Sequence, residues 1–386
     1  MALKEILIVG AGFSGAVLAR ELVESLDCEV LVWDERDHIA GNCHSERDEE
    51  TGIMVHKYGP HIFHTSNKIV WDYVNRYANF RPFTNRVKAH TDKGVFSLPI
   101  NLLTINQFFG RCFMPLEAEA FIASIGCEEI KGPETFEQQA LRFLGEDLYN
   151  SFFKGYTIKQ WGTHPSNLPA SILKRLPVRF NYDDNYYSSI YQGIPEEGYT
   201  TMVQNILNHP RIQIQLNTRF SKGDSSGFDH VFYSGPLDGF FDYSLGRLGY
   251  RTIYFERNVA DCSDYQGNAV INYCSEKVPY TRVHEHKHFT PWEKHDRTVY
   301  FTEYSKETTE ADVPFYPKRL EGDKELLKKY RQLAEAEQNV SFIGRLGTYR
   351  YLDMHQVIEE SLIFSKKVLS ACSTSSKIPI FPNEEI

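Results

Sequence analysis

Three glycines near the start of the chain are spaced to bind a dinucleotide. Gly10, Gly12 and Gly15 form the pattern G-x-G-x-x-G directly after the apolar run ILIV at 6–9. In this pattern the first glycine permits a tight turn, the second lets the backbone approach a pyrophosphate, and the third lets the next helix pack close to the strand. The peptide N–H groups at the start of that helix then point at the anion.

Asp34 lies where such a site needs an acid. It ends a second apolar run, Glu29 to Trp33, and follows Gly10 by 24 residues. At that place its carboxylate can accept a hydrogen bond from a ribose 2′-hydroxyl. Strand, glycine turn, helix (expected over 16–25), strand and acid therefore occur in the order of a dinucleotide-binding βαβ unit.

A second dense group of special residues follows at 54–65. The sequence MVHKYGPHIFHT combines three histidines with a glycine and a proline, which indicates a functional site. The chain shows no paired acids for glycoside hydrolysis, no nucleophile elbow and no metal-binding cluster. Its seven cysteines are an odd number without paired spacing, so they indicate neither a disulfide framework nor a metal site and fit a reducing cytosol.

Size and composition favour a folded protein of two or three domains. The chain has 386 residues, of which 41% are apolar and 14% aromatic, enough to fill real cores. The net charge of -9 argues against a general nucleic-acid binder and means that an anionic ligand must be held by locally placed arginines. No apolar run approaches the roughly 18 residues that span a bilayer, and Met1 leads directly into the first strand. A cytoplasmic protein without a membrane span is therefore expected.

The elements that must position these groups are expected in an α/β order that is interrupted twice. Residues 83–99 alternate around Lys93-Gly94 as a hairpin, and residues 104–174 have the apolar spacing of helices. Further helices and β-rich runs are predicted at 200–208, 212–216, 231–235, 250–256, 269–274, 298–304, 324–337, 340–345 and 353–369.

This order predicts a Rossmann-like nucleotide-binding domain with a helical insertion and an antiparallel sheet domain. The nucleotide-binding domain is discontinuous and is expected over 1–82, 200–244 and 315–372. A helical substrate or lid domain is expected over 101–180, and the sheet domain over 83–100, 181–199 and 245–314. The polar tail at 373–386 contains prolines and is expected to be disordered.

Several long and unusual strings together resemble the bacterial UDP-galactopyranose mutases, a family of flavoenzymes. Besides the glycine motif they are HIAGN (38–42), HKYGPHIFHT (56–65), KGYTIKQWG (154–162), KRLPVRF (174–180), YQGIP (191–195), GNAVIN (267–272), VPYTRVHEHKHF (278–289) and GRLGTYRYLDMHQ (344–356). The resemblance runs from the first strand to about Leu369. Three residues depart from the family's pattern, Ala40, Pro60 and Phe315, and none of them carries a group with assigned chemistry.

The resemblance implies a cofactor and a reaction. The cofactor is FAD rather than NAD, a choice that the glycine motif alone does not make, and it is active when reduced. In such mutases the flavin N5 acts as nucleophile on the anomeric carbon of UDP-galactopyranose, UDP is the leaving group, and UDP-galactofuranose is the product. The expected partners are these two nucleotide sugars and a reductant for the flavin. A homodimer is usual in similar proteins, and cell-surface polysaccharide biosynthesis is the usual context.

The resemblance also implies the residues of the site. Arg175 and Arg282 are expected to bind the diphosphate, and His61 to lie beside the flavin ring, as catalytic residues. The remaining expected substrate contacts are Asn85, Tyr156, Trp161, Tyr186, Asn272, Tyr316 and Tyr351. The expected cofactor contacts are Gly10, Gly12, Phe13, Ser14, Gly15, Asp34, Arg36, Gly41, Asn42, His61, Arg345, Asp353 and Met354.

Plainer roles are open for several of these residues. A tyrosine or tryptophan on an amphipathic helix usually packs in the core, a surface arginine usually pairs with an acid, and His61 and His64 can both be structural. The segment from Gln160 to Arg175 leaves a helix, contains a glycine and two prolines, and carries two expected substrate contacts. It is predicted to move inward as a lid when a UDP-sugar binds.

Two other functional classes share the dinucleotide motif. One is an FAD-dependent oxidoreductase of the amine-oxidase type, and the other is a dinucleotide-binding regulatory protein without catalysis. The oxidoreductase would need a hydride donor site and has no use for two arginines that converge on one diphosphate. The sequence leaves open whether an N-acetylated sugar is also accepted.

Overall fold

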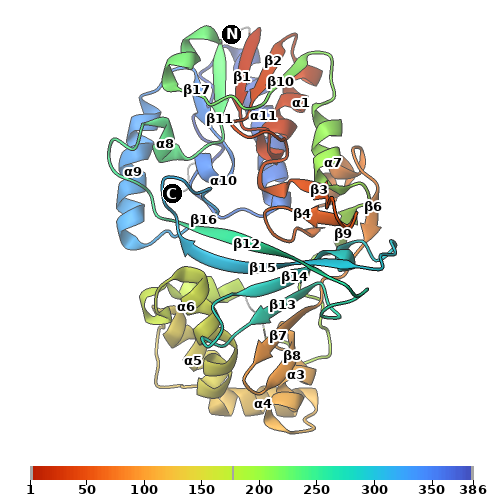
Figure 1. The fold of residues 1–386 in the computed structure, drawn as a ribbon. Coiled ribbons are helices and arrows are strands. Elements are labelled where there is room, and N and C mark those ends of the chain that lie inside the picture. The colour runs from red at the N-terminus through yellow and green to blue at the C-terminus, as the bar shows by residue number, and fades with distance from the viewer. Residues whose placement is uncertain (1–2, 176–177, 384–386) are drawn as a thin grey trace.

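The computed structural model describes residues 3–175 and 178–383, apart from the side chains of Ser171, Lys174 and Arg175. A five-stranded parallel sheet forms the upper part of the molecule (Figure 1). Its order is β10-β2-β1-β11-β17, and the strands are β1 (Glu5–Val9), β2 (Glu29–Trp33), β10 (Ile212–Gln215), β11 (His230–Tyr233) and β17 (Val340–Phe342). This is the Rossmann-like arrangement that the βαβ unit predicts.

Both faces of this sheet are covered by helices. Ile6 and Ile8 of β1 point into one core, whereas Leu7 between them points into another. The first core is completed by α1 (Phe13–Ser25), α2 (Lys68–Asn75), α7 (Gly198–Leu207) and α11 (Met354–Thr374). The second is completed by α8 (Leu237–Phe240) and α9 (Glu321–Glu335), and the short α10 (Gly344–Gly347) follows β17. Burial on both faces explains why β1 and β2 contain continuous apolar runs.

A seven-stranded sheet crosses the middle of the molecule (Figure 1). Its order is β16-β12-β15-β14-β13-β7-β8, and every neighbouring pair is antiparallel except β13 with β7. The strands are β7 (Val87–Thr91), β8 (Gly94–Leu98), β12 (Tyr250–Ala260), β13 (Val270–Tyr273), β14 (Arg282–Glu285), β15 (Thr298–Glu307) and β16 (Tyr316–Pro317). The predicted hairpin is β7 and β8, with its turn at Asp92 and Lys93.

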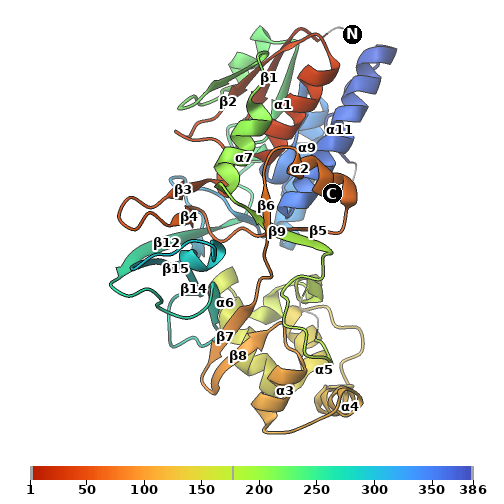
Figure 2. The ribbon, with the colours of Figure 1, turned by 90° about the vertical axis from the view of Figure 1, so that its right-hand side faces the viewer.

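A helical lobe lies against the lower end of this sheet (Figures 1 and 2). It consists of α3 (Leu102–Phe109), α4 (Pro115–Ile125), α5 (Phe136–Leu148), the π-helical η2 (Tyr149–Lys154), α6 (Gly155–Trp161) and two 3-10 turns, η3 (Pro165–Asn167) and η4 (Ala170–Arg175). Phenylalanines from α3, α5 and η2 fill its core together with Phe96 of β8.

The remaining strands form two small sheets. β3 (Ser45–Arg47) pairs with β4 (Met54–His56), and β9 (Tyr191–Pro195) lies between β5 (Phe63–Thr65) and β6 (Phe80–Pro82). Three further 3-10 turns are η1 (Gly41–Cys43), η5 (Lys222–Gly227) and η6 (His286–Phe289). Among the described residues no helix is both long enough and apolar enough to cross a bilayer.

The prediction of a disordered tail is wrong for the described part of it. α11 continues to Thr374, and the chain then returns to the parallel sheet. The backbone N–H of Phe342 donates to Ile380 O at 2.7 Å, and the Phe381 ring stacks on the Phe342 ring at 5.6 Å. Ile378 and Phe381 are buried, so apolar residues within a polar stretch cover the β17 edge of the sheet.

Candidate active site

In the glycine turn, side chains at Gly10 and Gly15 would collide with neighbouring atoms. Gly10 has φ +104°, and a Cβ atom there would lie 2.0 Å from Ser234 Oγ. A Cβ atom on Gly15 would lie 2.1 Å from Gly10 O and 2.9 Å from Ile8 Cγ2. The third glycine therefore lets α1 pack against β1, as its position in the motif predicts. The first turn of α1 then points into open space beside the sheet.

Asp34 is held by two backbone N–H groups at the end of β2. Its Oδ2 accepts from Ala11 N at 2.8 Å and its Oδ1 accepts from Arg36 N at 3.0 Å. The side chain is largely buried, yet it lines the cavity described below. A carboxylate fixed in this way keeps lone pairs directed at a ribose hydroxyl.

One cavity of about 1240 Å³ extends from the glycine turn to the central sheet. Twelve of the predicted cofactor contacts line it, and Gly15 lies behind its wall. The twelve are Gly10, Gly12, Phe13, Ser14, Asp34, Arg36, Gly41, Asn42, His61, Arg345, Asp353 and Met354. Residues from 10 to 354 therefore meet at the carboxyl ends of β1, β2, β11 and β17, where ligands bind in open α/β sheets.

Two buried arginine atoms on this wall have no hydrogen-bond partner among the described residues. They are Arg36 Nη1 and Arg345 Nε. Arg36 Nη2 donates to Asn42 Oδ1 at 2.9 Å, and Arg345 Nη2 donates to Phe315 O at 3.0 Å, so both guanidinium groups are held in place. Buried donors that lack partners are rare, and cationic ones at a cavity wall fit an anionic ligand.

Arg282 occupies the other end of the cavity, on β14. Its Nε donates to Glu303 Oε1 at 2.8 Å, and Glu303 is fully buried on the neighbouring strand β15. Burial is the largest single effect and opposes the charged form of Arg282, but the Glu303 carboxylate acts together with Tyr156 and Tyr316 and raises the pKa of Arg282 well above its ordinary value. The guanidinium is therefore a permanent cation whose remaining N–H groups are available to the cavity.

Three tyrosines line the same cavity, and two of them stack beside the Arg345 guanidinium. The rings of Tyr316 and Tyr351 stack at 5.7 Å, and Arg345 Cζ lies 5.6 and 5.0 Å from their centroids. Burial, ahead of any charge, raises the pKa of Tyr186, and the Arg282 cation acts to lower it. All three tyrosines line the cavity, and a phenol hydroxyl can donate a hydrogen bond to a phosphate oxygen.

His61 is neutral in this environment. Its backbone N–H donates to His56 Nδ1 at 3.0 Å, and its Nδ1–H donates to Gly59 O at 2.7 Å. Burial lowers the pKa of His61 to about 4. The Nε2 atom therefore carries a lone pair and is an acceptor at neutral pH.

Comparisons with known proteins identify the class of this site. A family model described as UDP-galactopyranose mutase matches residues 151–351, which is more than half of the chain. A model described as an NAD(P)-binding Rossmann-like domain matches residues 8–77.

The chain belongs to the UDP-galactopyranose mutase family.

Individual relatives of this mutase agree with the family models. A protein of Klebsiella pneumoniae named probable UDP-galactopyranose mutase is 56% identical and covers 98% of both chains. An Escherichia coli protein named dTDP-fucopyranose mutase is 51% identical over 93% of this chain and 97% of that protein. A crystal structure of reduced UDP-galactopyranose mutase has the same fold, with a TM-score of 0.73 at 15% identity over 95% of this chain and 96% of that one.

Among the described side chains, four predicted substrate contacts of the mutase lie outside the set that lines the cavity: Tyr156, Asn272, Asn85 and Trp161. Burial raises the pKa of Tyr156 on α6. The Arg282 cation lies near enough to act against this rise. Asn272 is buried on β13 directly opposite Arg282, and Asn85 is also buried. Trp161 packs against the core of the helical lobe. Arg175 ends η4, and its side chain lies outside the described residues.

Sequence reasoning missed Glu303, which holds Arg282. A signal was present, because Glu303 lies in the strand TVYFTEYSKE on the same face as the buried Phe301. An acid on the buried face of an apolar strand needs a cationic partner. His355 was missed as well, although it lies beside Asp353 and lines the same cavity.

Proposed function

We propose that this mutase interconverts UDP-galactopyranose and UDP-galactofuranose with FAD bound in the cavity. The observation that carries the proposal is that one cavity joins the dinucleotide-binding turn to the Arg282 cation. A cofactor bound at the turn and a nucleotide sugar bound at Arg282 would therefore share one enclosed space. When bound and fully reduced, the flavin supplies the nucleophile, its N5, for the anomeric carbon of the sugar.

The residues at the turn fit the adenosine and diphosphate parts of FAD. The N–H groups of the first turn of α1 and the unpartnered Arg36 Nη1 suit a diphosphate. Asp34 suits the ribose hydroxyl. Gly12 and Gly41 lie next to each other, and a Cβ atom on Gly41 would be 3.4 Å from Gly12 Cα. Because neither residue has a side chain, a ligand can approach the backbone at this place. The far end of the cavity, at His61 and Met354, is left for the flavin ring.

The protein's contribution to the reaction is position and charge. Arg282 is fixed by Glu303 and binds the diphosphate of the substrate, whose negative charge grows as the bond to the sugar breaks. Tyr316 and Tyr351 add hydroxyl donors to the same group. Arg175 is proposed as the second arginine, brought in from the helical lobe. Neutral His61 donates its Nδ1–H to Gly59 O, which leaves Nε2 as an uncharged acceptor at the cavity wall.

An assay that separates this function from an oxidoreductase uses the redox state of the flavin. Activity on UDP-galactofuranose is expected only after reduction with dithionite, and no electrons are consumed per turnover. An amine-oxidase type of enzyme would instead reduce its flavin with an amine and pass the electrons to oxygen. Turnover that consumes reductant in proportion to product, or a colourless protein that binds NAD, would contradict the proposal.

A second candidate substrate pair is favoured by the E. coli relative, whose name specifies dTDP-fucopyranose. The same diphosphate site and flavin serve both reactions. The two substrates differ at the methyl group of the base, the 2′-hydroxyl of the ribose and the 6-hydroxyl of the sugar. Parallel measurements of kcat/KM with both furanose nucleotides decide between them, and we expect the UDP-sugar to be preferred because the Klebsiella relative has the higher identity.

A further inference from the structure

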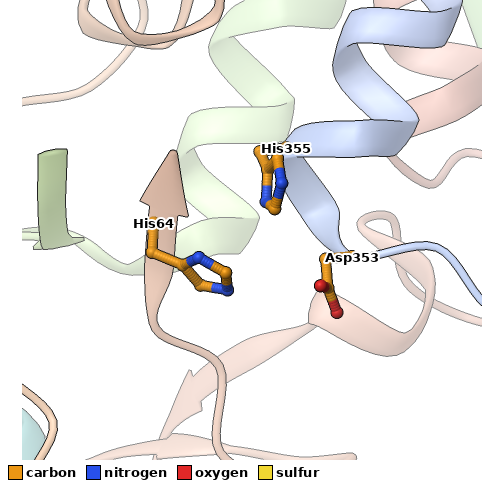
Figure 3. A group of neighbouring side chains, drawn as sticks. All are labelled: His64, Asp353 and His355. Atoms are coloured by element: carbon orange, nitrogen blue, oxygen red, sulfur yellow. The ribbon is translucent and has the colours of Figure 1, made fainter. Parts of the chain in front are cut away.

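Two histidines and an aspartate meet at the cavity wall beside the start of α11. His64 comes from β5, Asp353 precedes α11, and His355 lies in its first turn (Figure 3). One ligand atom from each of these side chains lies within 4.8 Å of those of the other two. All three residues are partly buried and line the cavity, so the group has an entry path and space beside it.

We infer that His64, Asp353 and His355 bind one divalent transition-metal ion. Two imidazoles and one carboxylate suit Co²⁺, Ni²⁺, Cu²⁺ or Zn²⁺, whereas Mg²⁺ and Ca²⁺ prefer oxygen ligands alone. A zinc ion holds imidazole nitrogen at about 2.0–2.1 Å, so its ligand atoms lie roughly 3–4 Å apart. Small side-chain rotations bring the three atoms into that range, and water from the cavity completes the coordination.

The environment of His64 prepares it as a ligand. Its Nδ1 lies 3.0 Å from Ser189 Oγ, and its ring stacks on Tyr187 at 3.8 Å. A hydrogen bond at one ring nitrogen fixes the ring and leaves Nε2 for a metal, as is usual for metal-binding histidines.

A second group of two acids and a histidine lacks these properties. Asp264, Glu285 and His288 also lie within 4.8 Å of one another, but Lys287 Nζ is 3.1 Å from Asp264 Oδ2 and already supplies a cation. The two oxygens of Glu285 accept from the backbone N–H groups of Tyr265 and Gln266 at 2.9 and 2.8 Å. This group is a satisfied network of ion pairs, which makes it a matched control.

The inference does not depend on the identity of the nucleotide sugar. Because the site lines the cavity that is proposed for the substrate, a bound ion would lie in the path of the nucleotide sugar and act as an inhibitor. Metal binding itself, measured directly, is the decisive property.

The test is equilibrium dialysis of the flavin-loaded chain, free of any affinity tag, against Zn²⁺. One equivalent per chain is expected in the parent. His355→Gln and His64→Gln should each weaken binding by about tenfold or more, whereas His288→Gln should leave it unchanged. The inference is overturned if the parent binds no zinc at about 1 mM, or if His355→Gln binds as the parent does.

A second measurement covers the case in which a variant fails to fold or loses its flavin. X-ray absorption of the zinc-loaded parent chain should show two imidazole ligands and no sulfur. A first shell without imidazole, or one that contains cysteine sulfur, would overturn the inference without any variant.

Discussion

The guanidinium of Arg282 and the carboxylate of Glu303 face each other across neighbouring strands, and Arg282 Nε donates to Glu303 Oε1 at 2.8 Å. The same carboxylate oxygen accepts from Thr281 Oγ1 at 2.9 Å, and Glu303 has no exposed surface. One edge of the guanidinium is thus held by the protein, which leaves its Nη groups for a bidentate contact with a diphosphate.

Glu303→Ala should therefore lower both stability and turnover. Removal of one partner of a buried pair leaves the other charge uncompensated and costs about 3 kcal/mol of folding free energy. Turnover should fall because Arg282 loses its orientation. Urea unfolding and steady-state kinetics measure the two effects. Glu256→Ala, an exposed acid on β12, is the control and should change neither. Normal kcat in folded Glu303→Ala protein would show that Arg282 does not need this partner.

Arg175→Ala should reduce kcat strongly while the flavin content stays the same. Its proposed contact with the diphosphate strengthens as UDP leaves, so its loss raises the barrier more than it weakens binding. One charge-assisted bidentate contact is worth roughly 3 kcal/mol, which corresponds to about a hundredfold in rate. Absorbance at the flavin band and initial rates are the measurements. Lys131→Ala, an exposed cation on the same lobe, is the control, and near-normal turnover of Arg175→Ala would make Arg175 a surface charge.

Much of the nucleotide-binding half could be predicted because its signals are local. β1 and β2 are apolar runs bounded by glycines or acids, and Asp34 needs only its distance from Gly10. The relation of Arg282 to Glu303 could not be found in this way, since the residues lie on different strands and only the register of β14 with β15 brings them together. A lone acid in a strand is usually expected to face solvent.

Other differences arise where tertiary packing overrides a local signal. Glycine and proline are residue types that favour turns, but β9 contains both Gly193 and Pro195, and Pro195 is the last residue of the strand. Trp161 is expected as a substrate contact, and its side chain packs against the core of the helical lobe. The tail read as disordered by composition, although Phe381 has a specific partner in Phe342 that only the fold supplies.

Asp34→Ala should yield a folded protein that has lost most of its FAD. The substitution removes the proposed ribose contact and leaves the N–H groups of Ala11 and Arg36 without their acceptor at the turn. Loss of one hydrogen bond to a charged group costs about 1.5–3 kcal/mol, or about 10- to 100-fold in affinity. The ratio of flavin to protein absorbance after dialysis measures it. Asp27→Ala, an exposed acid just before β2, should keep its flavin. Full flavin occupancy in Asp34→Ala would contradict the assigned contact.

Stability should fall steeply as the pH drops below about 6.5, because buried histidines are neutral in the folded chain. Burial lowers the pKa of His61 to about 4 and that of His286 to about 3, and it holds those of His56 and His284 well below their ordinary value. Below about pH 6.5 the unfolded chain binds protons that the folded chain does not, so acid favours unfolding until the folded pKa values are reached.

The magnitude makes this loss easy to detect. Each such histidine contributes up to about 1.4 kcal/mol per pH unit, so four give roughly 5 kcal/mol per unit near pH 5, comparable with the total stability of a typical domain. Urea unfolding at pH 7.5, 6.5 and 5.5 measures how steeply the free energy of unfolding changes with pH.

His286→Gln should lower this slope by about 1.4 kcal/mol per pH unit, the contribution of one proton. His288→Gln should steepen the slope. Burial lowers the pKa of His288, but the Glu285 and Asp264 carboxylates together outweigh burial and raise it, so protonation of His288 stabilises the fold at low pH. An equal slope in His286→Gln and the parent would show that His286 does not change its proton occupancy on unfolding.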